Sequence, residues 1–113
     1  MIPTLEELGR RAVACKAWYW MPGILDEDGD RVSTMDNGRD RELAGLIPDL
    51  SDPATLGCLL HLVREAWGGA PFHVEATHGP NGPGWRLQCG NRFQTYVCAT
   101  EAHALVAALE AAP

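Results

Sequence analysis

The chain has little positive charge and hardly any lysine. Of its 113 residues, nine are Lys or Arg and fifteen are Asp or Glu, so the formal net charge is −6. Lys16 is the only lysine. Proteins that hold nucleic-acid phosphates by charge need clustered basic residues. The composition therefore argues against direct nucleic-acid binding and favours either solubility alone or a basic partner.

Long hydrophobic runs and targeting signals are also missing. No apolar run approaches the roughly 20 residues with which a helix crosses a bilayer. Residues 1–7 have neither the basic nor the apolar region of a secretory signal peptide. We therefore expect a cytoplasmic protein that does not associate with membranes. Its length indicates one domain.

The cysteines lack the spacing of a metal or redox site. None of Cys15, Cys58, Cys89 and Cys98 forms a C-x-x-C pair, the spacing typical of zinc sites and of thioredoxin-like proteins. Free cysteines in helical or strand patterns pack as small hydrophobic residues. The sequence predicts reduced structural thiols, with no metal and no cofactor.

Residues 1–34 are predicted to form a helix followed by a hairpin. Thr4 and Glu7 match a capping box, so a helix is expected over about 5–16. The aromatic segment 18–21 favours a strand. Two more short strands, at 24–25 and 31–34, are expected on either side of the acidic turn 26–30 (DEDGD), because Asp-Gly suits a hairpin tip.

Residues 35–50 have the least regular pattern. Asp36-Asn37-Gly38 is a turn signal, and Pro48 stops a helix. We expect a mobile loop in this segment, with one helical turn at about 41–46.

Residues 51–113 predict a core in the order helix, three strands, helix. Asp52 and Pro53 begin the first of these helices, and Thr100 caps the last. Both helices are expected to cover the same face of the sheet. Period-two alternation predicts strands within 72–77, 85–89 and 93–98. The connections are expected at Gly79–Gly84, as a loop, and at Gly90-Asn91, as a two-residue turn.

The predicted fold is α+β. It has an antiparallel sheet of about four to five strands packed by three helices, in the order α-β-β-α-β-β-β-α. The single domain 1–113 then has three parts: a helix plus hairpin (1–34), a loop (35–50) and an αβββα core (51–113).

Four segments of this order resemble known proteins: 49–56 (DLSDPATL), 63–68 (VREAWG), 101–109 (EAHALVAAL) and the upstream 18–23 (WYWMPG). They look like small tailed-phage or prophage proteins with the phage ABA sandwich domain. The resemblance implies an alpha/beta/alpha sandwich with no assigned catalytic residues. The double-stranded-RNA-binding domain shares the order from residue 51 onward, but it needs basic residues at the start of its last helix. This chain has Thr100, Glu101, Ala102 and His103 there.

The candidate binding residues are two tryptophans and the acidic turn: Trp18, Trp20, Asp26, Glu27, Asp28 and Asp30. The tryptophans mark a binding patch if they are exposed, or seal their segment onto the core if they are buried. The turn lacks the distal glutamate of a calcium loop. A solvated hairpin tip, compatible with a protein-docking epitope, is the preferred interpretation.

Three other constellations carry weaker signals. They are a metal site from His73, Glu75 and His78, a Cys–His nucleophile from Cys98 and His103 or from Cys58 and His61, and a phosphate loop at 79–84. Neither Cys–His pair has a group to orient the base or a recognisable oxyanion hole. The loop lacks a following lysine and contains two prolines, which have no backbone donor. We therefore predict that none of them is a catalytic or metal site.

The expected function is non-catalytic binding of a host or phage macromolecule, with a protein as partner. One version is inhibition of a host defence complex, of the nuclease or CRISPR type, by an acidic surface that occupies a basic nucleic-acid groove. The alternative is a homo-oligomer, such as a homodimer, that acts as a nucleotide sponge or sensor. The wide apolar surface of the helix after Pro53 and the strand residues Arg86 and Arg92 motivate that alternative.

Overall fold

A computed structural model describes residues 2–35, 39–80, 82–90 and 92–113 of the chain. These residues form an α+β structure with four helices and a three-stranded antiparallel sheet. The α+β class is confirmed, whereas the predicted number and order of strands are not. The elements are α1 (Leu5–Val13), α2 (Arg39–Ala44), α3 (Pro53–Ala66), β1 (His73–Gly79), β2 (Gly82–Cys89), β3 (Phe93–Gln94) and α4 (Glu101–Glu110).

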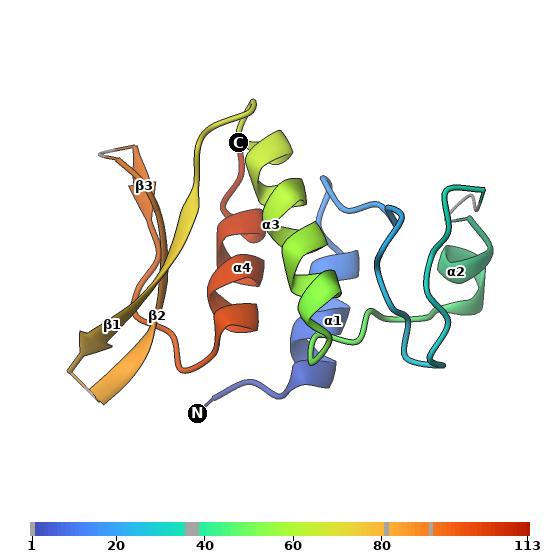
Figure 1. Cartoon of the computed structure of the whole chain (residues 1–113), viewed down its shortest axis with the longest axis horizontal. Coiled ribbons are helices and arrows are strands. Elements are labelled where there is room, and N and C mark those ends of the chain that lie inside the picture. Colours follow the sequence, from blue (N-terminus) through green and yellow to red (C-terminus); the bar gives the residue numbers. More distant parts are fainter. Residues whose placement is uncertain (1, 36–38, 81, 91) are drawn as a thin grey trace.

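The sheet and the helices are stacked side by side along the long axis of the molecule, which measures 41 × 30 × 20 Å. Figure 1 shows the sheet at one end, then α4, then α1 and α3, and finally the coil that surrounds α2 at the other end. The sheet and α2 therefore lie at opposite ends of the molecule (Figure 1).

The helix starts lie where the capping residues predicted them. The Thr4 side chain accepts a hydrogen bond from the amide of Glu7, and the Thr4 amide in turn donates one to the Glu7 carboxylate. Asp52 caps α3 through the amide of Thr55, and Thr100 caps α4 in the same way. These local hydrogen bonds satisfy amides that have no partner within the helix.

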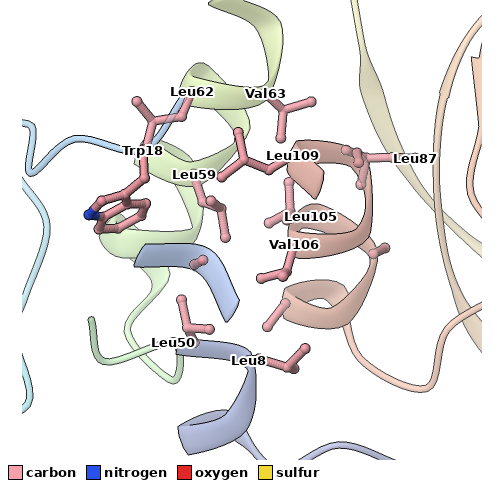
Figure 2. Close-up of a cluster of buried hydrophobic side chains, with 14 of the residues drawn as sticks. Leu8, Trp18, Leu50, Leu59, Leu62, Val63, Leu87, Leu105, Val106 and Leu109 are labelled. Atoms are coloured by element: carbon pink, nitrogen blue, oxygen red, sulfur yellow. The ribbon is translucent and has the colours of Figure 1, made fainter. Parts of the chain in front are cut away.

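Helix α4 is buried on two opposite sides. It contacts α1 and α3 on one side and β2 on the other. Figure 2 shows Leu59 of α3 and Leu105 of α4 between the two helices, and Leu87 of β2 on the far side of α4. All three residues are at most 1% exposed. The expectation that both core helices cover one sheet face is therefore only half right, because α4 covers the sheet and α3 packs mainly behind α4.

The register of the β1–β2 hairpin separates an apolar from a polar face. Val74 lies opposite Leu87, and Leu87 is fully buried toward α4. Glu75 lies opposite Arg86 on the other face, where the two form an ion pair. The predicted alternation of these two strands is confirmed.

The glycine-rich connection is shorter than expected. β1 continues through Gly79 and β2 begins at Gly82, so both ends of the predicted loop belong to strands. Gly82 has a φ of +104°, which glycine adopts without strain. Asn81 and the predicted turn residue Asn91 lie outside the described residues, as do residues 36–38.

A β-bulge interrupts the predicted third strand. Gln94 pairs with Gln88, and Cys98 pairs with Trp85. Three residues, 95–97, thus oppose the two residues 86–87, which is one more than a regular ladder allows. The extra residue shifts the alternation, so that Cys98 is buried while Val97 lies over the glycines of the hairpin on the other face.

The extended segments predicted before residue 35 are largely absent. Residues 18–21 form no strand, and the predicted pair of short strands is reduced to a single bridge between Leu25 and Arg31. Within the predicted loop 35–50, the helical turn expected at about 41–46 is present as α2, two residues earlier, at 39–44. Its last part pairs with the hairpin, since Pro48 forms a bridge with Asp26.

We predict that Leu105→Ala lowers the free energy of unfolding by about 2–5 kcal/mol, because it leaves a cavity between α3 and α4. The matched control is Leu43→Ala on α2. Leu43 is 78% exposed, and we expect a change within about 0.5 kcal/mol. Denaturant titrations of both variants measure the difference, and equal effects would contradict the central place of α4.

We predict opposite effects for two glycine-to-alanine changes. A Cβ on Gly84 would lie 2.6 Å from the carbonyl oxygen of Cys98, so Gly84→Ala should cost about 1–3 kcal/mol. Gly57 lies in α3 with no atom within 4 Å of such a Cβ, so Gly57→Ala should stabilise by about 0.4–1 kcal/mol. Thermal unfolding compares them, and a neutral Gly84→Ala would argue against the bulge.

Candidate docking site: the acidic lobe

Residues 26–52, here called the acidic lobe, carry the entire net charge of the chain. They contain nine of the fifteen acidic residues and three of the nine basic ones. The other residues hold six of each sign, so the net charge of −6 belongs to this segment alone. Most of the described residues of the lobe, α2 included, lie toward the end of the molecule opposite the sheet, and its last residues run back to the start of α3 (Figure 1).

The buried carboxylate of Asp26 organises the lobe. One of its oxygens accepts hydrogen bonds from the amides of Asp28 and Asp30, each at 3.0 Å, and so fixes the acidic turn. The other oxygen accepts from Nε of Arg41 in α2, also at 3.0 Å. Asp26 is only 2% exposed. This candidate residue therefore holds the hairpin and α2 together and is not presented to a partner.

The chain around Glu27 joins the hairpin to the last part of the lobe. The Glu27 amide donates to the carbonyl of Ile47 at 2.9 Å, and the Ile47 amide donates to the Glu27 carboxylate at 3.2 Å. The Asp49 amide donates to the carbonyl of Leu25 at 2.8 Å. The predicted mobile loop is thus hydrogen-bonded to the hairpin at this point.

Trp18 and Trp20 lie inside the molecule. They are 9% and 4% exposed, and their rings pack edge to face with centroids 5.3 Å apart. The Arg41 guanidinium lies 5.9 Å from the ring centroid of Trp20, within the range of a cation–π contact. Of the two interpretations left open for these tryptophans, the structure supports the seal onto the core.

Within the lobe, an ion pair joins the hairpin residue Arg31 to Asp52, the residue that caps α3. The Arg31 guanidinium donates to both carboxylate oxygens of Asp52, at 2.8 and 3.2 Å. Asp52 also accepts from the amide and hydroxyl of Thr55. Arg31 in the first place, and Thr55 in the second, hold the pKa of Asp52 well below its ordinary range.

The outer surface of the lobe combines carboxylates with apolar side chains. Met35 is 92% exposed and Leu43 is 78% exposed. The acidic residues exposed beside them on the described part of the lobe are Glu27, Asp28, Asp30, Asp40 and Glu42. No sequence motif marks Asp40, Glu42 or the two apolar residues. The density of acidic residues along 26–52 does point to the two acids.

The metal site considered from the sequence is not assembled among the described residues. His73 and Glu75 share a sheet face, with 4.0 Å between their nearest atoms, but His78 belongs to the opposite face by register. The described residues contain no group of three metal-binding side chains. They also contain no helix with the length and hydropathy needed to span a bilayer.

Cys98 and His103 both line a hollow of about 330 Å³ near the start of α4. The Cys98 thiol donates to the carbonyl of Tyr96 at 3.4 Å, and burial raises the pKa of this thiol. Burial also lowers the pKa of His103. Both shifts favour the neutral pair, whereas a nucleophilic cysteine needs a lowered thiol pKa. At the other pair, burial likewise raises the pKa of Cys58.

We predict a pH-dependent effect of Arg31→Gln. Ionised Asp52 stabilises the fold above its ordinary pKa of 3.8, and this stabilisation is lost as the pH falls toward the lowered pKa of the folded state. The variant should therefore melt below the wild type at pH 7, with a difference that narrows below about pH 4. Arg10→Gln is the control, because its pair with Glu6 is mostly exposed. A pH-independent difference would contradict the assignment.

Comparison with known proteins adds no further constraint on the site. The chain matches no family model, no curated protein and no solved structure. The resemblance to phage proteins therefore stays a prediction, and the function has to be argued from the residues of the fold itself.

Proposed function

We propose that the protein is a non-catalytic binding protein that docks the acidic lobe onto a basic surface of a partner protein. The observation that carries this proposal is the segregation of charge, with the net −6 confined to residues 26–52 and the remainder balanced. Opposite potentials on two surfaces speed their encounter and select the partner.

The construction of the lobe supports a docking role. Its shape is fixed from within by the Asp26–Arg41 pair, whose side chains are 2% and 12% exposed. The outer carboxylates of Asp28 and Asp30 are therefore held by a backbone that is already ordered. A surface that is ordered before binding loses less conformational entropy when the partner arrives.

The exposed apolar residues of the lobe add a second kind of contact. Met35 and Leu43 expose most of their surface in the isolated chain. Apolar side chains ringed by polar ones are typical of the energetic centre of an interface, where the surrounding contacts exclude water. We assign Leu43 this role in the proposed complex, and the carboxylates the role of steering.

The partner that fits best is a protein with a nucleic-acid groove. Such grooves present clustered Lys and Arg side chains, and an acidic lobe competes with the phosphate backbone for them. A small phage or prophage protein that inhibits a nuclease complex of the host defence would act in this way. The phage setting rests only on the resemblance of the core and capping segments.

The alternative of a nucleotide sponge has less support. The Arg86 side chain donates to the Glu75 carboxylate. The Arg92 guanidinium lies over the ring of Trp67, 5.4 Å from its centroid, and also donates to the Trp67 carbonyl at 3.1 Å. Both arginines that motivated this alternative are thus engaged within the chain.

Affinity capture from a host lysate tests the proposed function. We expect the wild type to retain a nucleic-acid-binding protein that is released by salt and by added DNA. Asp28→Lys combined with Asp30→Lys should raise the measured dissociation constant by at least about tenfold. Leu43→Ala should also weaken binding, although it should leave the stability unchanged.

The matched control has the same change of charge outside the lobe. Glu65→Lys combined with Glu101→Lys reverses two carboxylates on α3 and α4, outside the lobe. This variant should bind as the wild type does. Equal loss of binding in both double variants would show that only total charge matters, and capture of no basic partner would refute the proposal.

A further inference from the structure

One edge of the sheet is formed by β1, which has no second partner strand among the described residues. The strand order is β1-β2-β3, so β1 (His73–Gly79) is an edge strand along its full seven residues. It contains no proline, lysine or bulge within this range. Those are the devices by which natural proteins usually prevent an edge from pairing with another strand.

The hydrogen bonds of β2 identify which groups of β1 face outward. The Trp85 amide donates to the Cys98 carbonyl at 2.7 Å, and the Cys98 amide donates to the Trp85 carbonyl at 2.8 Å. Both backbone groups of Trp85 therefore point away from β1. Since Ala76 lies opposite Trp85, the amide and carbonyl of Ala76 point to the free edge.

The same alternation applies along the strand. Val74 and His78, two residues to either side of Ala76, also direct their amides and carbonyls outward. Among the described residues, none hydrogen-bonds to these six groups. Ala76 and His78 are exposed, and Val74 is half-buried. The edge thus offers an unbroken row of donors and acceptors.

We propose that β1 pairs with β1 of a second copy of this chain, antiparallel and with the two-fold axis at Ala76, to form a continuous six-stranded sheet. In this register Ala76 lies opposite its own copy, and Val74 lies opposite His78. Each of these pairs exchanges two hydrogen bonds, as directly opposed residues of this type do in antiparallel sheets. The proposal goes beyond the docking function and does not depend on it.

The side chains and charges of the edge are compatible with self-pairing. Glu75 would lie opposite Thr77, not opposite a second carboxylate, and its charge is already paired with Arg86. Both copies would carry α4 on the same face of the joined sheet, so the two acidic lobes would project from that face, beyond α4 and the layer of α1 and α3 (Figure 1). The lobes therefore lie away from the paired edge itself, and charges further apart than about 8 Å are largely screened at physiological salt.

Apolar side chains beside the edge would add to the stability of the proposed dimer. Trp85 is only half-buried and forms, with Ala76 and Ala99, part of the lining of an open hollow of about 350 Å³. Trp85 and Ala76 are neighbours across the β1–β2 ladder. In the proposed dimer the two copies of this pair would form one strip, Trp85–Ala76–Ala76–Trp85, on the same face of the joined sheet.

A charge swap at Ala76 tests both the partner and the register. The wild type should be a dimer by light scattering and native mass spectrometry. Ala76→Lys and Ala76→Glu should each raise the dimer dissociation constant by at least about tenfold, because like charges would be directly opposed. An equimolar mixture of these two variants should form a heterodimer, since residue 76 then faces the opposite charge.

The control is Thr77→Lys, one residue away on the other face. This lysine would lie opposite Glu75 of the other copy, so the dimer should persist. Hydrogen exchange of the wild type gives a second readout, in which the amides of Val74, Ala76 and His78 should be protected at high concentration and lose protection on dilution. A monomeric wild type, or a dimer that Ala76→Lys leaves intact, would overturn the proposal.

Discussion

The burial of α4 from two sides is the constraint on which the rest of the structure depends. Its small residues Ala104 and Ala108 are fully buried, and such side chains let neighbouring elements approach closely. The indole of Trp67 donates to the Ala108 carbonyl at 3.0 Å and so joins the end of α3 to the same helix. Arg11 of α1 pairs with Glu110 at its last turn. The sheet and the other two helices of the core thus share one central element.

This arrangement has a consequence for folding. Neither the sheet nor α3 can complete its apolar contacts until residues 101–110 are in place, because α4 lies between them. The contacts that close the core join segments far apart along the chain, such as Arg11 and Glu110. Structures with many such contacts fold more slowly than those built from local ones. The capped helices are the local elements that can form first.

Much of the local structure could be predicted from the sequence, because it depends on neighbours along the chain. The capping residues Thr4, Asp52 and Thr100 predicted where α1, α3 and α4 begin. The alternation of apolar and polar residues predicted β1 and β2. The bulge at 95–97 could not be foreseen, since it depends on how Cys98 and Trp85 meet in space. The aromatic segment 18–21 has strand-forming residues, but the packing of Trp18 against Trp20 outweighs that preference.

The candidate site was predicted in part for the same reason. The sequence pointed to the acidic turn, but not to the buried role of Asp26, whose partner Arg41 is fifteen residues away. It also placed Trp18 and Trp20 among the binding candidates, although their exposure depends on tertiary contacts. By contrast, the exposure of Asp28 and Asp30 agrees with what the polar composition of the turn predicts.

The net charge belongs to residues 26–52, most of which lie toward one end of an elongated molecule, and this uneven distribution gives the molecule an electric dipole moment. In the field of a highly basic macromolecule such a particle experiences a torque as well as an attraction. It would rotate during its approach until residues 26–52 face the partner, so that the two molecules are oriented before they make contact. A chain with the same total charge spread evenly would approach without a preferred orientation, and most of its encounters would not lead to a complex.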